Sequence, residues 1–167
     1  MSWSEFRAAI GLTGGSGIAK EVLCGIAGYI ALLPVLAAGA AVTIFLAKQT
    51  GTDAAHPVVE ALSGPLWMLL LIFGLAVIWA PITEELMFRG AFFGHARAIM
   101  AWPIAATFVG LLFAAIHPQG WAGIPVLAAI GFNLAVLRQW RGSIIAPIAA
   151  HALNNGTALT LGVMLLR

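Results

Sequence analysis

Long apolar runs separated by short polar connections dominate the pattern of this chain. Five runs stand out, at residues 22–47, 66–97, 101–117, 121–137 and 143–165. Since about 20 apolar residues cross a bilayer as an α-helix, the pattern predicts about five spanning helices. The second run would be about 50 Å long, more than one bilayer crossing, and it contains Pro81. Because proline removes a backbone donor and clashes with the preceding turn, we expect this helix to be kinked or broken there.

Composition indicates the same fold class. Hydrophobic residues make up 62% of the 167 positions and charged residues only 8%, against about 25% charged residues in soluble domains. We therefore expect an all-α, polytopic transmembrane bundle, with one membrane-embedded domain at 22–167 and an N-terminal cytoplasmic segment at 1–21. The net charge of +2 comes from scattered basic residues, which argues against a nucleic-acid partner. The single cysteine, Cys24, excludes an internal disulfide and a multi-cysteine metal site.

The basic residues indicate the orientation of the bundle. If the N-terminus is cytoplasmic, one side holds Arg7, Lys20, Arg97, Arg138 and Arg141, and the other holds Lys48 and Arg167. This bias follows the positive-inside rule, so we expect a multi-pass protein of a bacterial cytoplasmic membrane with its N-terminus inside. We assign the arginines of the two turns to topology and to contacts with lipid headgroups. The polar, Gly-rich start of the chain argues against a cleavable signal peptide.

A few ionisable and amide side chains lie inside the predicted spans, where they are costly unless paired or hydrated and so mark candidate functional sites. They are Glu84, Glu85, Arg89, His95, His117 and His151, with the amides Asn133, Asn154 and Asn155. Counted along their helices, Glu84, His117 and His151 stand about 22, 25 and 17 Å from the cytoplasmic turns. Three different helices therefore deliver a carboxylate and two imidazoles to one layer of the bilayer interior.

Spacing within the helices refines these roles. Glu85 and Arg89 are four residues apart with the acid first, the favoured order for an ion pair on one helix face. That pair would leave Glu84, turned by about 100°, free for chemistry. Two further pairs share this spacing: His151 with Asn155, and Phe113 with His117.

These residues resemble the motifs of a known family. EELMFRG at 84–90 matches the EExxxR motif of the CAAX-protease and bacteriocin-processing (CPBP, Abi) intramembrane proteases. FAAIH at 113–117 resembles the family's FxxxH motif, and GSIIAPIAAHALNN at 142–155 resembles the segment with its HxxxN motif. The similarity covers about residues 65–167, with the three motifs in order. It implies an intramembrane glutamate endopeptidase similar to the type II CAAX prenyl endopeptidase, which removes the last three residues of a prenylated protein.

The resemblance also implies a role for each motif residue. Glu84 would be the general base for water, and His117 would help to position that water. His151 and Asn155 would stabilise the oxyanion of the tetrahedral intermediate. The residues that would support the site structurally are Glu85, Arg89 and Phe113.

Two other functions fit the same residues. A zinc metallopeptidase could use Glu84, His117 and His151, since two histidines and a glutamate form a catalytic zinc set; the glutamate mechanism needs no cofactor. A non-enzymatic membrane scaffold, immunity protein or small transporter would use the polar centre for contacts or ions. For an endopeptidase, the expected partners are the lipid bilayer and a membrane-associated peptide or protein substrate, lipidated or not. His95 and Asn133 match no motif, and we interpret both as interhelical or interfacial contacts.

Overall fold

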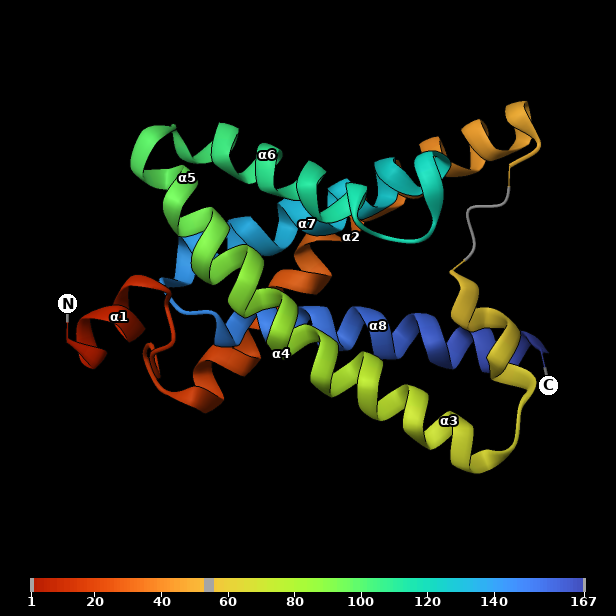
Figure 1. Ribbon diagram of the computed structural model, residues 1–167, viewed down its shortest axis with the longest axis horizontal. Coiled ribbons are helices and arrows are strands. Elements are labelled where there is room, and N and C mark those ends of the chain that lie inside the picture. Colours follow the sequence, from red (N-terminus) through yellow and green to blue (C-terminus); the bar gives the residue numbers. More distant parts are fainter. Residues whose placement is uncertain (1, 53–55, 167) are drawn as a thin grey trace.

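The structure is a computed structural model that describes residues 2–52 and 56–166, and every regular element within these ranges is helical (Figure 1). The elements are α1 (Trp3–Ala9), α2 (Ile18–Thr50), η1 (Pro57–Ser63), α3 (Leu66–Phe73), η2 (Gly74–Trp79), α4 (Ala80–Glu85), η3 (Leu86–Phe92), α5 (Phe93–Ile99), α6 (Trp102–Ala115), α7 (Gly120–Arg141) and α8 (Ile145–Leu166). Here η1 is a 3₁₀ helix, whereas η2 and η3 are π-helical. The predicted all-α fold class is confirmed.

The second apolar run forms one unbroken helix that carries half of the candidate site. It extends over 34 residues from Leu66 to Ile99, and α3, η2, α4, η3 and α5 are consecutive segments of it. Of the two expected forms, kinked or broken at Pro81, the broken helix is excluded, because the backbone stays right-handed helical at Trp79 and Ala80. The irregularity takes the form of the π segment η2, which ends directly before α4. Such single π segments are often found at functional sites.

Three helices are long and apolar enough to cross a membrane among the residues that the structure describes: Ile18–Thr50, Leu66–Ile99 and Gly120–Arg141. The third predicted span, α6, has 14 residues and is therefore about 21 Å long, shorter than the hydrocarbon core of a bilayer. The fifth, α8, has 22 residues, but its middle carries the polar residues His151, Asn154 and Asn155. The last predicted outside charge, Arg167, lies outside the described residues.

The helices pack as two pairs joined by α2. In Figure 1, α6 lies along α7, and the long α3–α5 helix crosses α8, while α2 contacts both α7 and α8. The main apolar core lies between η3, α5, α6 and α7 and includes Phe88, Val109, Phe113 and Ala135. Most large apolar side chains on the outer faces are exposed, as expected for surfaces that meet lipid. The polar residues of the candidate site therefore lie where the two pairs meet.

The start of α2 differs from the prediction for a physical reason. The helix begins at Ile18 rather than at residue 22, so it includes the fully buried Glu21. Arg141 at the end of α7 donates from Nε to Glu21 Oε2 (3.0 Å) and from Nη2 to Oε1 (2.7 Å). This pair satisfies the carboxylate inside the protein and lets the helix extend past it. Arg141, assigned above to headgroup contacts, thus pairs within the protein.

Candidate active site

Glu84 projects from α4 toward two histidines from other parts of the fold. Its Oε2 atom lies 3.9 Å from Nε2 of His117, in the turn just after α6, and 3.8 Å from Nε2 of His151 in α8. The Glu84 side chain is 27% exposed, against 17% for His117 and 3% for His151. No described residue lies within hydrogen-bonding distance of Glu84 Oε2. The structure therefore brings together the three residues that sequence reasoning placed at one level. The Glu84 side chain is partly exposed, but its Oε2 atom is buried and has no hydrogen-bond partner.

The imidazole of His117 is held by the residue one turn before it. Its Nδ1 atom lies at 2.5 Å from the carbonyl oxygen of Phe113, and its ring centroid is 4.2 Å from that of Phe113. A carbonyl oxygen can only accept, so Nδ1 of His117 carries the hydrogen. In the neutral imidazole the lone pair then belongs to Nε2, which faces Glu84. Phe113 also makes an edge contact with the ring of His151.

Glu85 binds two groups on different helices through one oxygen. Its Oε1 atom lies 2.8 Å from Arg89 Nη1 and 2.8 Å from His151 Nδ1, and all three side chains are buried. Arg89 also donates from Nη2 to the carbonyl of Gly131 in α7 (2.8 Å) and lies 4.9 Å above the Phe113 ring. The predicted Glu85–Arg89 pair is present. The contact between Glu85 and His151 was missed, because sequence spacing gives no signal for a contact across 66 residues.

These contacts determine which ring nitrogen donates and which accepts in each of the two histidines. His151 Nδ1 donates to the Glu85 carboxylate, as His117 Nδ1 donates to a carbonyl. Both Nε2 atoms therefore face Glu84 Oε2 as acceptors while the imidazoles are neutral. Whatever binds between the three atoms must donate protons or carry positive charge, since three acceptors cannot satisfy one another.

The amide of Asn155 makes a different contact from the one implied by the resemblance. Its Nδ2 atom donates to the carbonyl of Ala76 in η2 (2.9 Å), and its Oδ1 accepts from Asn154 Nδ2 (3.3 Å). Asn155 is half-buried, one turn beyond His151 on α8. One of its two N–H groups is thus engaged by the backbone of the long helix.

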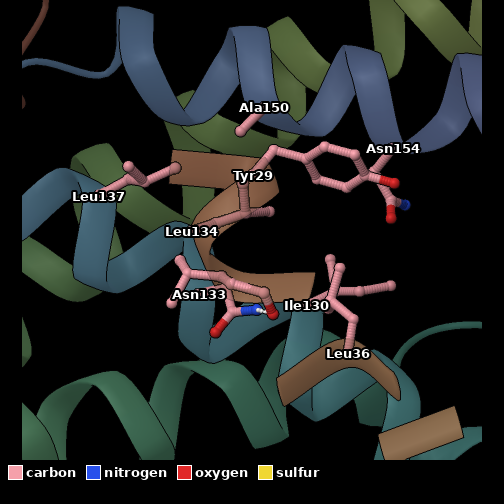
Figure 2. A pocket seen from close by; sticks show the side chains of 9 residues that line it. Tyr29, Leu36, Ile130, Asn133, Leu134, Leu137, Ala150 and Asn154 are labelled. Atoms are coloured by element: carbon pink, nitrogen blue, oxygen red, sulfur yellow. Dashed lines mark hydrogen bonds between the residues drawn. The ribbon is translucent and has the colours of Figure 1, made fainter. Parts of the chain in front are cut away.

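The remaining polar residues lie away from this cluster. Asn133 donates to the carbonyl of Leu32 (3.4 Å), an interhelical contact between α7 and α2 as expected. A cavity of about 20 Å³ beside it is lined by Tyr29, Leu134 and Asn154 among others (Figure 2). None of the three residues that converge on Glu84 Oε2 lines this cavity. His95, the other residue without a motif, is exposed on α5.

A fourth histidine, not singled out in the sequence, sits near the cluster. His56 precedes η1, and its Nδ1 accepts from the Val58 N–H (3.0 Å). Partial burial lowers the pKa of His56, and positive charge on His117 lowers it further. The imidazoles of His56 and His117 therefore repel each other when both are protonated.

The described residues contain no group of three or more His, Cys, Asp or Glu side chains arranged to hold a metal ion. The two Glu84–histidine distances of 3.8 and 3.9 Å exceed the roughly 3.3 Å that separates two ligands of a tetrahedral zinc ion with bonds of about 2.0 Å. A metal would therefore require the three side chains to move closer together.

Comparison with known proteins identifies the relatives of this helical core. The family model described as "Type II CAAX prenyl endopeptidase Rce1-like" matches residues 65–157, more than half of the chain. The matched range includes the long helix with Glu84 and continues to α8 with His151 and Asn155. The comparisons with curated proteins and with solved structures find no match.

Proposed function

Because the chain belongs to the type II CAAX prenyl endopeptidase Rce1-like family, a family of CAAX-type intramembrane proteases, we propose that Glu84 activates a water for peptide hydrolysis. Three long apolar helices together with the family make the chain an integral membrane protein. The proposed substrate is a membrane-associated protein or peptide, whose scissile bond reaches Glu84 at the accessible side of the cluster.

The approach of two acceptor atoms, Glu84 Oε2 and His117 Nε2, carries this proposal. A water between Glu84 Oε2 and His117 Nε2 has two hydrogens to donate, one to each atom. Glu84 then takes a proton as the water oxygen attacks the carbonyl carbon, and it returns that proton to the leaving amine. His117 holds the water in line through the Nε2 lone pair, which the Phe113 carbonyl keeps directed at Glu84.

His151 is proposed to act in its protonated form. Since Nδ1 is engaged by Glu85, only an imidazolium offers an Nε2–H to an oxyanion. Glu84, Glu85 and Arg89 together carry one negative charge, and an imidazolium would bring the cluster to neutrality. Asn155 would contribute the N–H that it does not give to Ala76.

The experiment is cleavage of a panel of membrane-associated peptides, prenylated and unmodified, by the purified protein. We expect Glu84→Gln to keep the fold and substrate binding while turnover falls by about 10²–10⁴-fold, because an amide cannot accept the water's proton. The matched control is Glu60→Gln, the same change at an exposed position in η1, which should leave turnover unaltered. Full activity in Glu84→Gln would contradict the proposed base.

Zinc catalysis is the alternative mechanism, because two imidazole lone pairs and a carboxylate form a donor set that binds zinc. Dialysis against a chelator separates the two mechanisms. Activity that survives dialysis supports direct activation of water by Glu84. Activity that is lost and then restored by zinc would make Glu84, His117 and His151 metal ligands.

A further inference from the structure

The backbone of the long helix has an interrupted hydrogen-bond ladder two turns before Glu84. In the π segment η2 each N–H reaches back five residues, and the last such bond runs from Ala80 N–H to Leu75 O. The next donor in this register would be residue 81, with Ala76 O as its acceptor. Residue 81 is proline, which has no N–H. The Ala76 carbonyl is therefore left without its helical donor.

The carbonyl that Pro81 leaves unpaired is the one that Asn155 binds. The Asn155 Nδ2 atom lies 2.9 Å from Ala76 O, and the neighbouring Asn154 amide donates to Asn155 Oδ1, which fixes the amide orientation. The next residue is Gly156, and a Cβ there would stand 3.7 Å from the Val77 side chain. The two helices are thus close enough here for a single added methyl group to reach van der Waals contact.

We propose that Asn155 is a positioning residue: its side-chain amide replaces the N–H that Pro81 lacks and fastens α8 to the helix that carries Glu84. An unpaired carbonyl inside a membrane protein is costly, so this bond favours one register between the two helices. His151 lies one turn before Asn155 on α8, and its Nε2 is 3.8 Å from Glu84 Oε2. A slip of α8 by a fraction of a turn would separate these atoms.

A second proline in the chain has a similar arrangement. Pro125 lies inside α7, and the Val126 N–H that follows it donates to the hydroxyl of Thr43 in α2 (3.2 Å). In both places a polar side chain of a neighbouring helix binds a backbone group beside a helix-interior proline. Pro125 therefore offers a matched control that is remote from Asn155.

A double-mutant cycle tests the proposal through stability. In the wild-type background, Asn155→Ala should lower the midpoint of thermal unfolding in detergent by about 3–8 °C, because it leaves a buried carbonyl unpaired. In the Pro81→Ala background, where the backbone N–H is restored, the same change should cost less than half as much. In the Pro125→Ala background the cost should equal that in wild type. Equal costs in all three backgrounds would overturn the proposal.

Turnover separates positioning from direct contact with the oxyanion. The positioning of His151 against Glu84 rests on the proposed function, whereas the unfolding measurement does not. We expect the Pro81→Ala/Asn155→Ala double variant to turn over faster per folded molecule than Asn155→Ala alone. A backbone N–H at position 81 cannot reach an oxyanion in place of Asn155, so this gain reports the helix register. A double variant no faster than Asn155→Ala would contradict the positioning role. If Asn155→Ala does not fold, Asn155→Leu, which has a similar branched shape and no hydrogen-bond donor, replaces it throughout.

Discussion

A single oxygen atom, Oε1 of Glu85, connects the structural and the proposed chemical parts of the site. It accepts from Arg89 on its own helix and from His151 on α8, both at 2.8 Å. Loss of either partner changes the environment of the other, so the two contacts are coupled. The role of structural support that the resemblance implies for Glu85 is therefore incomplete, because Glu85 also orients an imidazole of the proposed site.

Removal of Arg89 should be more harmful than neutralisation of Glu85. Arg89→Ala leaves the fully buried Glu85 carboxylate without its cation and the Gly131 carbonyl without a donor, which should cost about 3–5 kcal/mol. Glu85→Gln keeps an oxygen that can accept from Arg89 and His151, so we expect a smaller loss. Folded yield and the midpoint of thermal unfolding in detergent measure the loss of stability in each of the two variants. Equal stability of Arg89→Ala and wild type would show that the pair does not stabilise the fold.

Local spacing predicts some of these contacts and is silent on others. The Glu85–Arg89 pair follows from four-residue spacing on one helix. The approach of Glu84 to His117 and His151 follows from counting residues along antiparallel helices. The bond from His151 to Glu85 depends on side-chain rotamers at a helix crossing, which no periodicity in the sequence reports.

At the scale of elements, α6 and α7 cross with their backbones in direct contact. A Cβ placed on Gly131 would stand 2.7 Å from the Cα of Gly110, so the two backbones touch with no room for a side chain. Glycine at helix crossings in membranes allows such an approach. The carbonyl of Gly131 is also the acceptor for Arg89. This crossing therefore sets the position of the Glu85–Arg89 pair relative to α7.

Gly131→Ala should push α6 and α7 apart. Because the neighbour at Gly110 is backbone, it cannot rotate away, and we expect a loss of about 1–3 kcal/mol. The matched control is Gly74→Ala, at a helical position where no atom lies within 4 Å of a new Cβ; that change should be neutral or stabilising. The stabilities of the two variants are compared by their midpoints of thermal unfolding in the same detergent. A Gly131→Ala variant as stable as Gly74→Ala would show that the crossing is not tight.

Helix ends and irregular segments were the least predictable elements. The apolar runs locate each long helix, but the pairing of Glu21 with Arg141 extends α2 beyond its run. The π segments could not be anticipated, because the apolar pattern of the sequence does not distinguish them from α-helix. The short α1 had a usable signal: Ser2 and Glu5 form a capping box before Trp3–Ala9, a pattern typical of a helix start.

At the scale of the whole molecule, the N-terminal segment and two arginine-bearing turns meet at one end. Arg97 donates from Nε to Gln139 Oε1 (3.0 Å), which joins the turn after α5 to the end of α7. The N-terminal segment packs on the turn after α7, where the Ile144 N–H donates to Gly11 O (2.9 Å). The grouping of basic residues on one side, assumed from the sequence, has a structural basis in these contacts.

The positive-inside rule then predicts that this end is cytoplasmic. Single cysteines placed in a Cys24→Ser background report the orientation through labelling with a membrane-impermeant thiol reagent. Ile99→Cys and Trp140→Cys lie at exposed positions of the shared end and should react only after the cells are permeabilised. Thr52→Cys, just after α2 and exposed, should react in intact cells. If Ile99→Cys and Trp140→Cys are labelled from opposite sides of the membrane, the two turns do not share an end. That result would contradict the arrangement that brings Glu84, His117 and His151 together. If both are labelled in intact cells, the orientation is the reverse of the one predicted.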